Sequence, residues 1–147
     1  MLKSLYCIRN AHNCSSMITT RGFQQIEHLK NKWKDKNDIE LVITDKDYKS
    51  LITAKGIFQK KPLISIEFLY SPNYEYSDKI FNANRNDYGK KYHERIKLFY
   101  DFIRERKEVS IAYVGHDKFI SHLANKQNIK RCYPYLFELS MKDYCEN

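Results

Sequence analysis

The sequence lacks the features that mark several large classes of protein. No apolar run approaches the roughly 20 residues of a membrane span, and no segment repeats at the period of a solenoid. No stretch has the biased composition of a linker or a low-complexity tract. The apolar run after Lys3 stops at Arg9, which is too short for the core of a signal peptide. These absences favour a cytoplasmic protein with one folded domain over residues 1–147.

The sequence also lacks any Cys-x-x-Cys pair, although it has four cysteines: Cys7, Cys14, Cys132 and Cys145. In a protein that is not secreted we expect them to be reduced, with Cys7 in the core. A zinc site from His12, Cys14 and more distant partners is an alternative, but its spacing matches no standard set of ligands. We therefore expect neither a metal nor a cofactor.

Positive charge, in contrast, is abundant. Lysine and arginine number 26 against 18 acidic residues, which gives a net charge of +8. Such a balance favours anionic partners, namely phosphorylated small molecules, phosphoproteins or nucleic acid. The basic residues are spread along the chain, so they also fit an ordinary solvated surface.

Strand patterns and helix patterns alternate along the chain. Apolar runs predict strands over residues 2–9, 39–44, 63–66, 109–114 and 135–139. Apolar residues at helical spacing predict a helix over residues 87–106 and others capped by Thr19 or Thr20, by Asp45 and by Asp117. This alternation predicts a three-layer α/β/α domain with a mostly parallel central sheet.

Four charged residues follow the ends of predicted strands: Arg9, Lys49, Glu67 and His116. Each alone could be an ordinary surface, helix or turn residue. Ligands of such folds bind beyond the carboxyl ends of the strands, so we expect these side chains along one edge. Arginine offers a fork of donors to phosphate, while lysine and protonated histidine add charge. With Glu67 as a proton donor, the pattern predicts a phosphate site with an acid beside it.

The motifs, taken in order, resemble those of the histidine phosphatase superfamily, which includes phosphoglycerate mutases, acid phosphatases and short phosphohistidine phosphatases. Residues 5–13 (LYCIRNAHN) look like the opening strand and Arg-His-Gly motif of this family. Residues 18–25 (ITTRGFQQ) resemble its Leu-Thr-x-x-Gly-x-x-Gln helix start. Three later stretches resemble further family segments: residues 41–54 with Lys49, Thr53 and Ala54, residues 66–67, and residues 114–116.

The resemblance implies a phosphoglycerate mutase-like fold and metal-free phosphoryl transfer. In the family a histidine attacks the phosphoryl group, two arginines and a second histidine hold the phosphate, and a carboxylate protonates the leaving group. By position, Arg9 and His116 match phosphate-binding residues, and Glu67 matches the acid.

Two positions depart from the family in ways that bear on catalysis. Asn10 stands where the nucleophilic histidine is expected, and an amide has no basic lone pair with which to attack phosphorus. Lys49 stands where the second arginine is expected, which keeps the charge but loses the bidentate geometry. The sequence therefore predicts a pseudophosphatase that binds a phosphorylated small molecule or phosphoprotein.

Two alternatives would keep the protein active as a phosphatase of phosphomonoesters or phosphoproteins. His12 could replace the missing nucleophile, or Asn10 could be an engineered residue where the natural chain has histidine. A cysteine phosphatase is disfavoured, because six residues rather than five separate Cys14 from Arg21.

A further alternative is a basic nucleic-acid-binding module. The segment from Tyr70 to Asn86 carries tyrosines that could stack on bases. Under the leading hypothesis the same segment is an ordered insertion that walls or covers the pocket.

Overall fold

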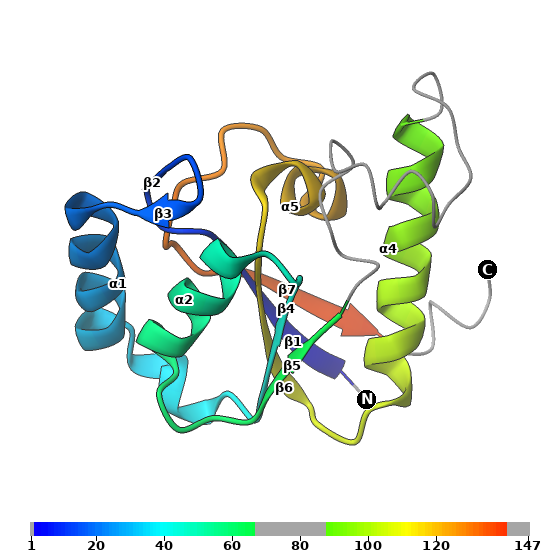
Figure 1. Ribbon diagram of the computed structural model, residues 1–147. Coiled ribbons are helices and arrows are strands. Elements are labelled where there is room, and N and C mark those ends of the chain that lie inside the picture. The colour runs from blue at the N-terminus through cyan, green and yellow to red at the C-terminus, as the bar shows by residue number, and fades with distance from the viewer. Residues whose placement is uncertain (1, 67–87, 141–147) are drawn as a thin grey trace.

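The computed structural model describes the backbone of residues 2–66 and 88–140, and within the second range the side chains from Tyr92 onward. Over these ranges a five-stranded sheet forms the centre of the molecule, in the order β5-β4-β6-β1-β7 (Figure 1). Its strands are β1 (Leu2–Arg9), β4 (Leu41–Thr44), β5 (Leu63–Ser65), β6 (Ser110–Gly115) and β7 (Tyr135–Ser140). Neighbouring strands are parallel except for β7, which pairs with β1 in the antiparallel sense. The expected mostly parallel sheet is confirmed.

Helices cover both faces of this sheet. One face is covered by α1 (Thr20–Lys32) and α2 (Tyr48–Ile57), and the other by α4 (Tyr88–Glu105) and α5 (Asp117–Ala124) (Figure 1). A small hairpin of β2 (Asn13–Cys14) and β3 (Met17–Ile18) precedes α1, and a short 3-10 helix, η1 (Lys34–Asp38), follows α1. The three-layer architecture is therefore also confirmed.

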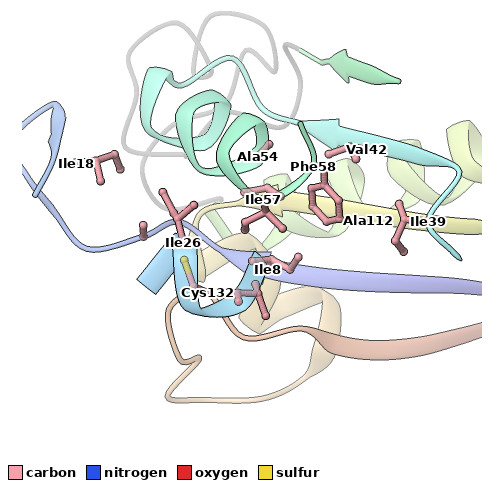
Figure 2. Close-up of a cluster of buried hydrophobic side chains, with 13 residues drawn as sticks. Ile8, Ile18, Ile26, Ile39, Val42, Ala54, Ile57, Phe58, Ala112 and Cys132 are labelled. Carbon is pink, nitrogen blue, oxygen red and sulfur yellow. The ribbon is translucent and has the colours of Figure 1, made fainter. Parts of the chain in front are cut away.

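Successive side chains along each strand point to opposite faces of the sheet, so the molecule has two separate hydrophobic cores. In β6, Ile111 and Tyr113 point to the α4 and α5 side, whereas Ala112 and Val114 point to the α1 and α2 side. Figure 2 shows the second core, in which Ile8, Val42 and Ala112 from the sheet meet side chains of the helices. Strands buried on both faces need the nearly continuous apolar sequence that predicted them.

Three helix starts are settled by the structure. Thr19 rather than Thr20 caps α1, since its hydroxyl accepts a hydrogen bond from the Gly22 amide at 3.1 Å. The prediction that Asp45 caps α2 is wrong, because Asp47 accepts from the Lys49 amide at 2.9 Å. The cap position of α5 is His116 and not Asp117, which is already helical.

None of the helices in the described ranges combines the length and the apolar character needed to cross a membrane.

Candidate functional site

The loop of residues 10–12 follows β1, and every backbone amide and carbonyl in it is hydrogen-bonded. The three amides donate to Gly115 O at 3.0 Å, Thr53 Oγ1 at 3.2 Å and Gln25 Oε1 at 2.8 Å. The first two carbonyls accept from Arg131, and the third accepts from both the amide and the hydroxyl of Thr19. The loop is therefore held by β6, α1, α2 and the segment before β7, as a preorganised site requires.

Gly22 lets α1 approach this loop. A Cβ atom at Gly22 would lie 2.2 Å from the His12 carbonyl oxygen, which is closer than real atoms approach. Thr19 contacts the loop as well, because its hydroxyl lies 2.7 Å from His12 Nδ1 while it caps the helix. The side chain of His12, the proposed replacement nucleophile, is thus held at the start of α1.

On one side of the loop lie two arginines, Arg9 and Arg131, which we call the arginine side. Arg9 Nη1 donates to Ile129 O at 2.9 Å, and its Nη2 lies 3.8 Å from the half-exposed carboxylate of Asp117. Arg131 Nη1 donates to the carbonyls of residues 10 and 11 at 3.3 and 3.1 Å. The backbones of Arg9 and Arg131 pair in a parallel bridge. Burial lowers the pKa of Arg131, and the positive charge of Arg9 lowers it further.

On the other side, Lys49 and His116 meet two aspartates, and we call this group the carboxylate side. His116 Nε2 donates to Asp47 Oδ2 at 3.0 Å, and Lys49 Nζ lies 3.7 Å from the same oxygen. The second carboxylate, Asp45 Oδ2, lies 3.6 Å from His116 Nε2. The two aspartates belong to the turn between β4 and α2, and His116 follows β6.

The carboxylate side has a characteristic set of pKa shifts. Burial raises the pKa of Asp45 to about 6, although the charge of His116 opposes the rise. Burial also acts to raise the pKa of Asp47, but hydrogen bonds from His116 and the Lys49 amide bring it below its usual range. For His116, burial acts to lower the pKa, and the hydrogen bond to Asp47 with the charge of Asp45 outweighs it, so the pKa is raised. The geometry thus favours a charged pair of His116 with Asp47.

Asn10 is the first residue of the loop and is only 3% exposed. Its Oδ1 atom has no hydrogen-bond partner among the described residues. A buried amide oxygen without a donor is costly, and such atoms in native proteins call for an explanation such as a water, an ion or a ligand. The amide can accept or donate a hydrogen bond here, but it cannot act as a nucleophile toward phosphorus.

The structure brings together several of the residues that the sequence singled out. Arg9 and Asn10 end β1, Lys49 lies in the first turn of α2, and His116 follows β6. These positions follow the carboxyl ends of β1, β4 and β6, which are neighbours in the sheet. In Figure 1 the loop after β1 leads to the β2–β3 hairpin, and the chain after β6 leads into α5. The predicted acid, Glu67, and the segment from Tyr70 to Asn86 lie outside the described residues.

Sequence reasoning missed Asp47 and Arg131 as parts of the site. Asp47 was missed because the sequence predicted Asp45, which is two residues closer to the strand, as the helix cap. Arg131 lies in the segment before β7, and only the pairing of that segment with β1 brings it to the loop. The turn sequence of residues 44–49, with two aspartates before a lysine, was the signal available for the first.

In residues 2–66 and 88–140 there is no group of three or more histidine, cysteine or acidic side chains placed to hold a metal ion. Cys14, a ligand in the alternative zinc site, is exposed and unpaired with another cysteine.

No protein-family model and no curated protein matches this chain by sequence. Solved structures share its fold, and a phosphoglycerate mutase from Bacillus anthracis superposes with a TM-score of 0.69 at 14% identity, covering 95% of this chain and 89% of that one. A phosphohistidine phosphatase SixA from Agrobacterium tumefaciens, described as putative, gives 0.61 at 13% identity, covering 95% and 92%. A phosphoserine phosphatase mutant from Entamoeba histolytica, with a histidine replaced by alanine and phosphoserine bound, gives 0.61 at 16% identity, covering 90% and 94%. The fold is therefore phosphoglycerate mutase-like.

Proposed function

We propose that this chain is a degenerate member of the histidine phosphatase superfamily, which binds a phosphate group on a small molecule or a phosphoprotein and does not form phosphohistidine. The observation that carries the proposal is Asn10, a buried amide in a fully hydrogen-bonded loop directly after Arg9. In one well-studied hydrolase, removal of the nucleophile cost roughly a millionfold in turnover. A loss of that order leaves binding as the remaining task of the site.

Binding without the covalent step is chemically reasonable for these residues. Arg9 can present its guanidinium fork to phosphate oxygens, because the hydrogen bond from its Nη1 goes to a neutral carbonyl, Ile129 O, and leaves the charge in place. Arg131 adds a second positive charge beside the loop. A structural neighbour that lacks one histidine was crystallised with phosphoserine, so this fold can hold a phosphorylated ligand after such a loss.

The test measures binding and turnover on the same preparation of the full chain. We expect calorimetry to show binding of inorganic phosphate, and Arg9→Met to weaken it by about tenfold or more, since one charge-assisted contact is lost. Arg104→Met is the matched control, because Arg104 pairs with Asp101 on α4, away from the loop. We expect no turnover of p-nitrophenyl phosphate and no acid-labile phosphoprotein.

The same experiment includes Asn10→His, which returns an imidazole to the nucleophile position. Phosphatase activity in this variant alone would show that the rest of the site is competent. Robust turnover by the unmodified chain would refute the loss of chemistry, and if His12→Ala then abolished that turnover, His12 would be the nucleophile. Failure of the chain to bind phosphate at all would refute the binding function.

A further inference from the structure

On the carboxylate side, two groups that the sequence predicts to bind phosphate already contact a carboxylate of the protein. Lys49 Nζ and His116 Nε2 lie 3.7 and 3.0 Å from one atom, Asp47 Oδ2. Both cations also lie in partly buried surroundings, where water screens charge less than at an open surface. An incoming phosphate would therefore meet two cations whose charge is already partly balanced by Asp47.

The position of the Asp47 carboxylate is fixed by a second task. Its Oδ1 atom accepts the Lys49 amide at 2.9 Å and caps α2, while Oδ2 contacts the two cations. The Asp47 amide in turn donates to Asp45 Oδ1 at 3.0 Å, and this carboxylate is fully buried. The side chain of Asp47 is therefore oriented by the start of α2. In an ordinary surface ion pair, both side chains are flexible.

We propose that Asp47 determines how strongly the candidate site binds anions, because its carboxylate competes with them for Lys49 and His116. This inference rests on the proposed function. A bound phosphate shares these cations with the carboxylate, displaces it from them, or binds through the arginine side alone. In each case the negative charge of Asp47 opposes the ligand, so the chain binds phosphate more weakly than its positive residues would suggest.

Asp47→Asn separates this role from helix capping. Asparagine caps a helix as well as aspartate does, so the variant keeps the hydrogen bond to the Lys49 amide while losing the charge. Asp101→Asn is the matched control, since it removes a carboxylate that pairs with Arg104 at 3.4 Å on α4. Asp47→Ser, which also preserves a good cap, takes the place of the first variant if that variant is not folded by circular dichroism.

Binding of inorganic phosphate is measured by calorimetry at pH 7 and low salt on the full chain. We expect Asp47→Asn to bind about tenfold more tightly than the unmodified chain, or better, because one opposing charge beside the ligand is removed. The control should bind as the unmodified chain does. In the Asp47→Asn background, Lys49→Met should remove most of the gain, since the freed cation is then missing.

A second measurement does not depend on phosphate. The pKa of the His116 ring, followed by nuclear magnetic resonance in the absence of ligand, should be lower in Asp47→Asn than in the unmodified chain. An unchanged pKa would show that the two side chains do not form the pair, and would overturn the inference whatever the chain binds.

The binding data then distinguish the two proposals. If the unmodified chain binds phosphate and Asp47→Asn binds it no more tightly, the inference fails and the proposed function stands. If neither protein binds phosphate although the His116 pKa responds to the substitution, the proposed function fails and takes the inference with it. Tighter binding together with a lowered His116 pKa supports both.

Discussion

The two sides of the loop of residues 10–12 hold their positive charges in different ways. On the arginine side, Arg9 and Arg131 donate their short hydrogen bonds to backbone carbonyls. On the carboxylate side, Lys49 and His116 share the carboxylate of Asp47. A carbonyl oxygen fixes a guanidinium group and leaves its net charge in place, whereas a carboxylate cancels the charge it pairs with.

A hydrogen bond to a carbonyl therefore holds a cation in place, whereas an ion pair with a carboxylate also neutralises it. Arg131 supports the loop and still contributes a full positive charge beside Arg9, which is why the two arginines oppose one another electrostatically. The Arg9 pair with Asp117 is longer, at 3.8 Å, and Asp117 is half exposed, so water screens that pair. We conclude that the arginine side is where an anion meets the least opposition.

The first test of this comparison removes the buried acid of the carboxylate side by Asp45→Asn. Burial raises the pKa of Asp45 to about 6 from its ordinary 3.8. Between those pH values the folded protein keeps a proton that the unfolded chain releases, so the free energy of unfolding falls as pH rises from about 4 to about 6 and stays lower above that. A shift of this size is worth at most about 3 kcal/mol. We expect Asp45→Asn to gain stability relative to the unmodified chain over that interval.

Urea denaturation of both proteins at pH 4.5, 6 and 7.5 checks this expectation. Asp101→Asn, which removes a partly exposed carboxylate on α4, should show no comparable change with pH. A difference in stability between Asp45→Asn and the unmodified chain that is the same at all three pH values would mean that the carboxylate side does not bury a charge, and the comparison would lose its basis.

The second test disturbs the loop that both sides share. In Gly22→Ala the new methyl group would lie 2.2 Å from the carbonyl oxygen of His12, so either the loop or α1 must move. Overpacking against backbone typically costs about 1–3 kcal/mol, and we expect urea denaturation to show a loss in this range. Binding of phosphate should weaken as well, because Arg9 and Asn10 precede the displaced residue.

Gly56→Ala provides the matched substitution on α2. Its methyl group would lie 2.6 Å from a side-chain methyl of Ile26, which can shift, and alanine in a helix interior gains about 1 kcal/mol over glycine. The loss of stability should therefore be smaller than in Gly22→Ala, with phosphate binding unchanged. Equal losses of unfolding free energy in the two variants would show that the loop of residues 10–12 can move to accept the methyl group, despite its hydrogen bonds.

Much of this fold could be predicted because its strands are buried on both faces. The near-continuous apolar runs in the second half of residues 2–9 and at residues 109–114 favour buried strands of a parallel sheet, and β1 and β6 are parallel neighbours in it. Their carboxyl ends then had to share an edge, which places Arg9 near His116 without any knowledge of side-chain contacts.

The partners of those residues could not be predicted in the same way. Asp45 and Asp47 are both plausible helix caps, and only the path of the turn decides which one reaches the Lys49 amide. Arg131 lies in a segment that pairs with the end of β1, and its side chain donates to the Ala11 carbonyl at a sequence separation of 120. Local patterns carry no information on such a contact, because it depends on how the chain returns to the sheet.

The smallest expected effect is a difference in stability between two variants, each of which lacks one cation from one side of the loop. Arg131→Met removes a donor from the carbonyls of residues 10 and 11, and the second of these still accepts from Asn13 Nδ2 at 2.9 Å. The buried Asn10 carbonyl loses its donor, so we expect a loss of about 1–3 kcal/mol. Lys49→Met breaks only an ion pair at 3.7 Å to a side chain that His116 still contacts, and we expect a loss below about 1 kcal/mol. Methionine keeps comparable length and apolar volume at both positions, so the difference between the variants reports the polar contacts.

Urea denaturation at pH 7 measures both losses, and repeating it at high salt sharpens the result. The Lys49→Met loss should shrink with salt because it is Coulombic, while the Arg131→Met loss should persist because ions do not screen the cost of an unsatisfied buried carbonyl. If the two substitutions cost the same and respond alike to salt, then Arg131 acts as a charge rather than as a support. The arginine side would then be held in the same way as the carboxylate side, and the argument for where an anion binds would have to rest on Arg9 alone.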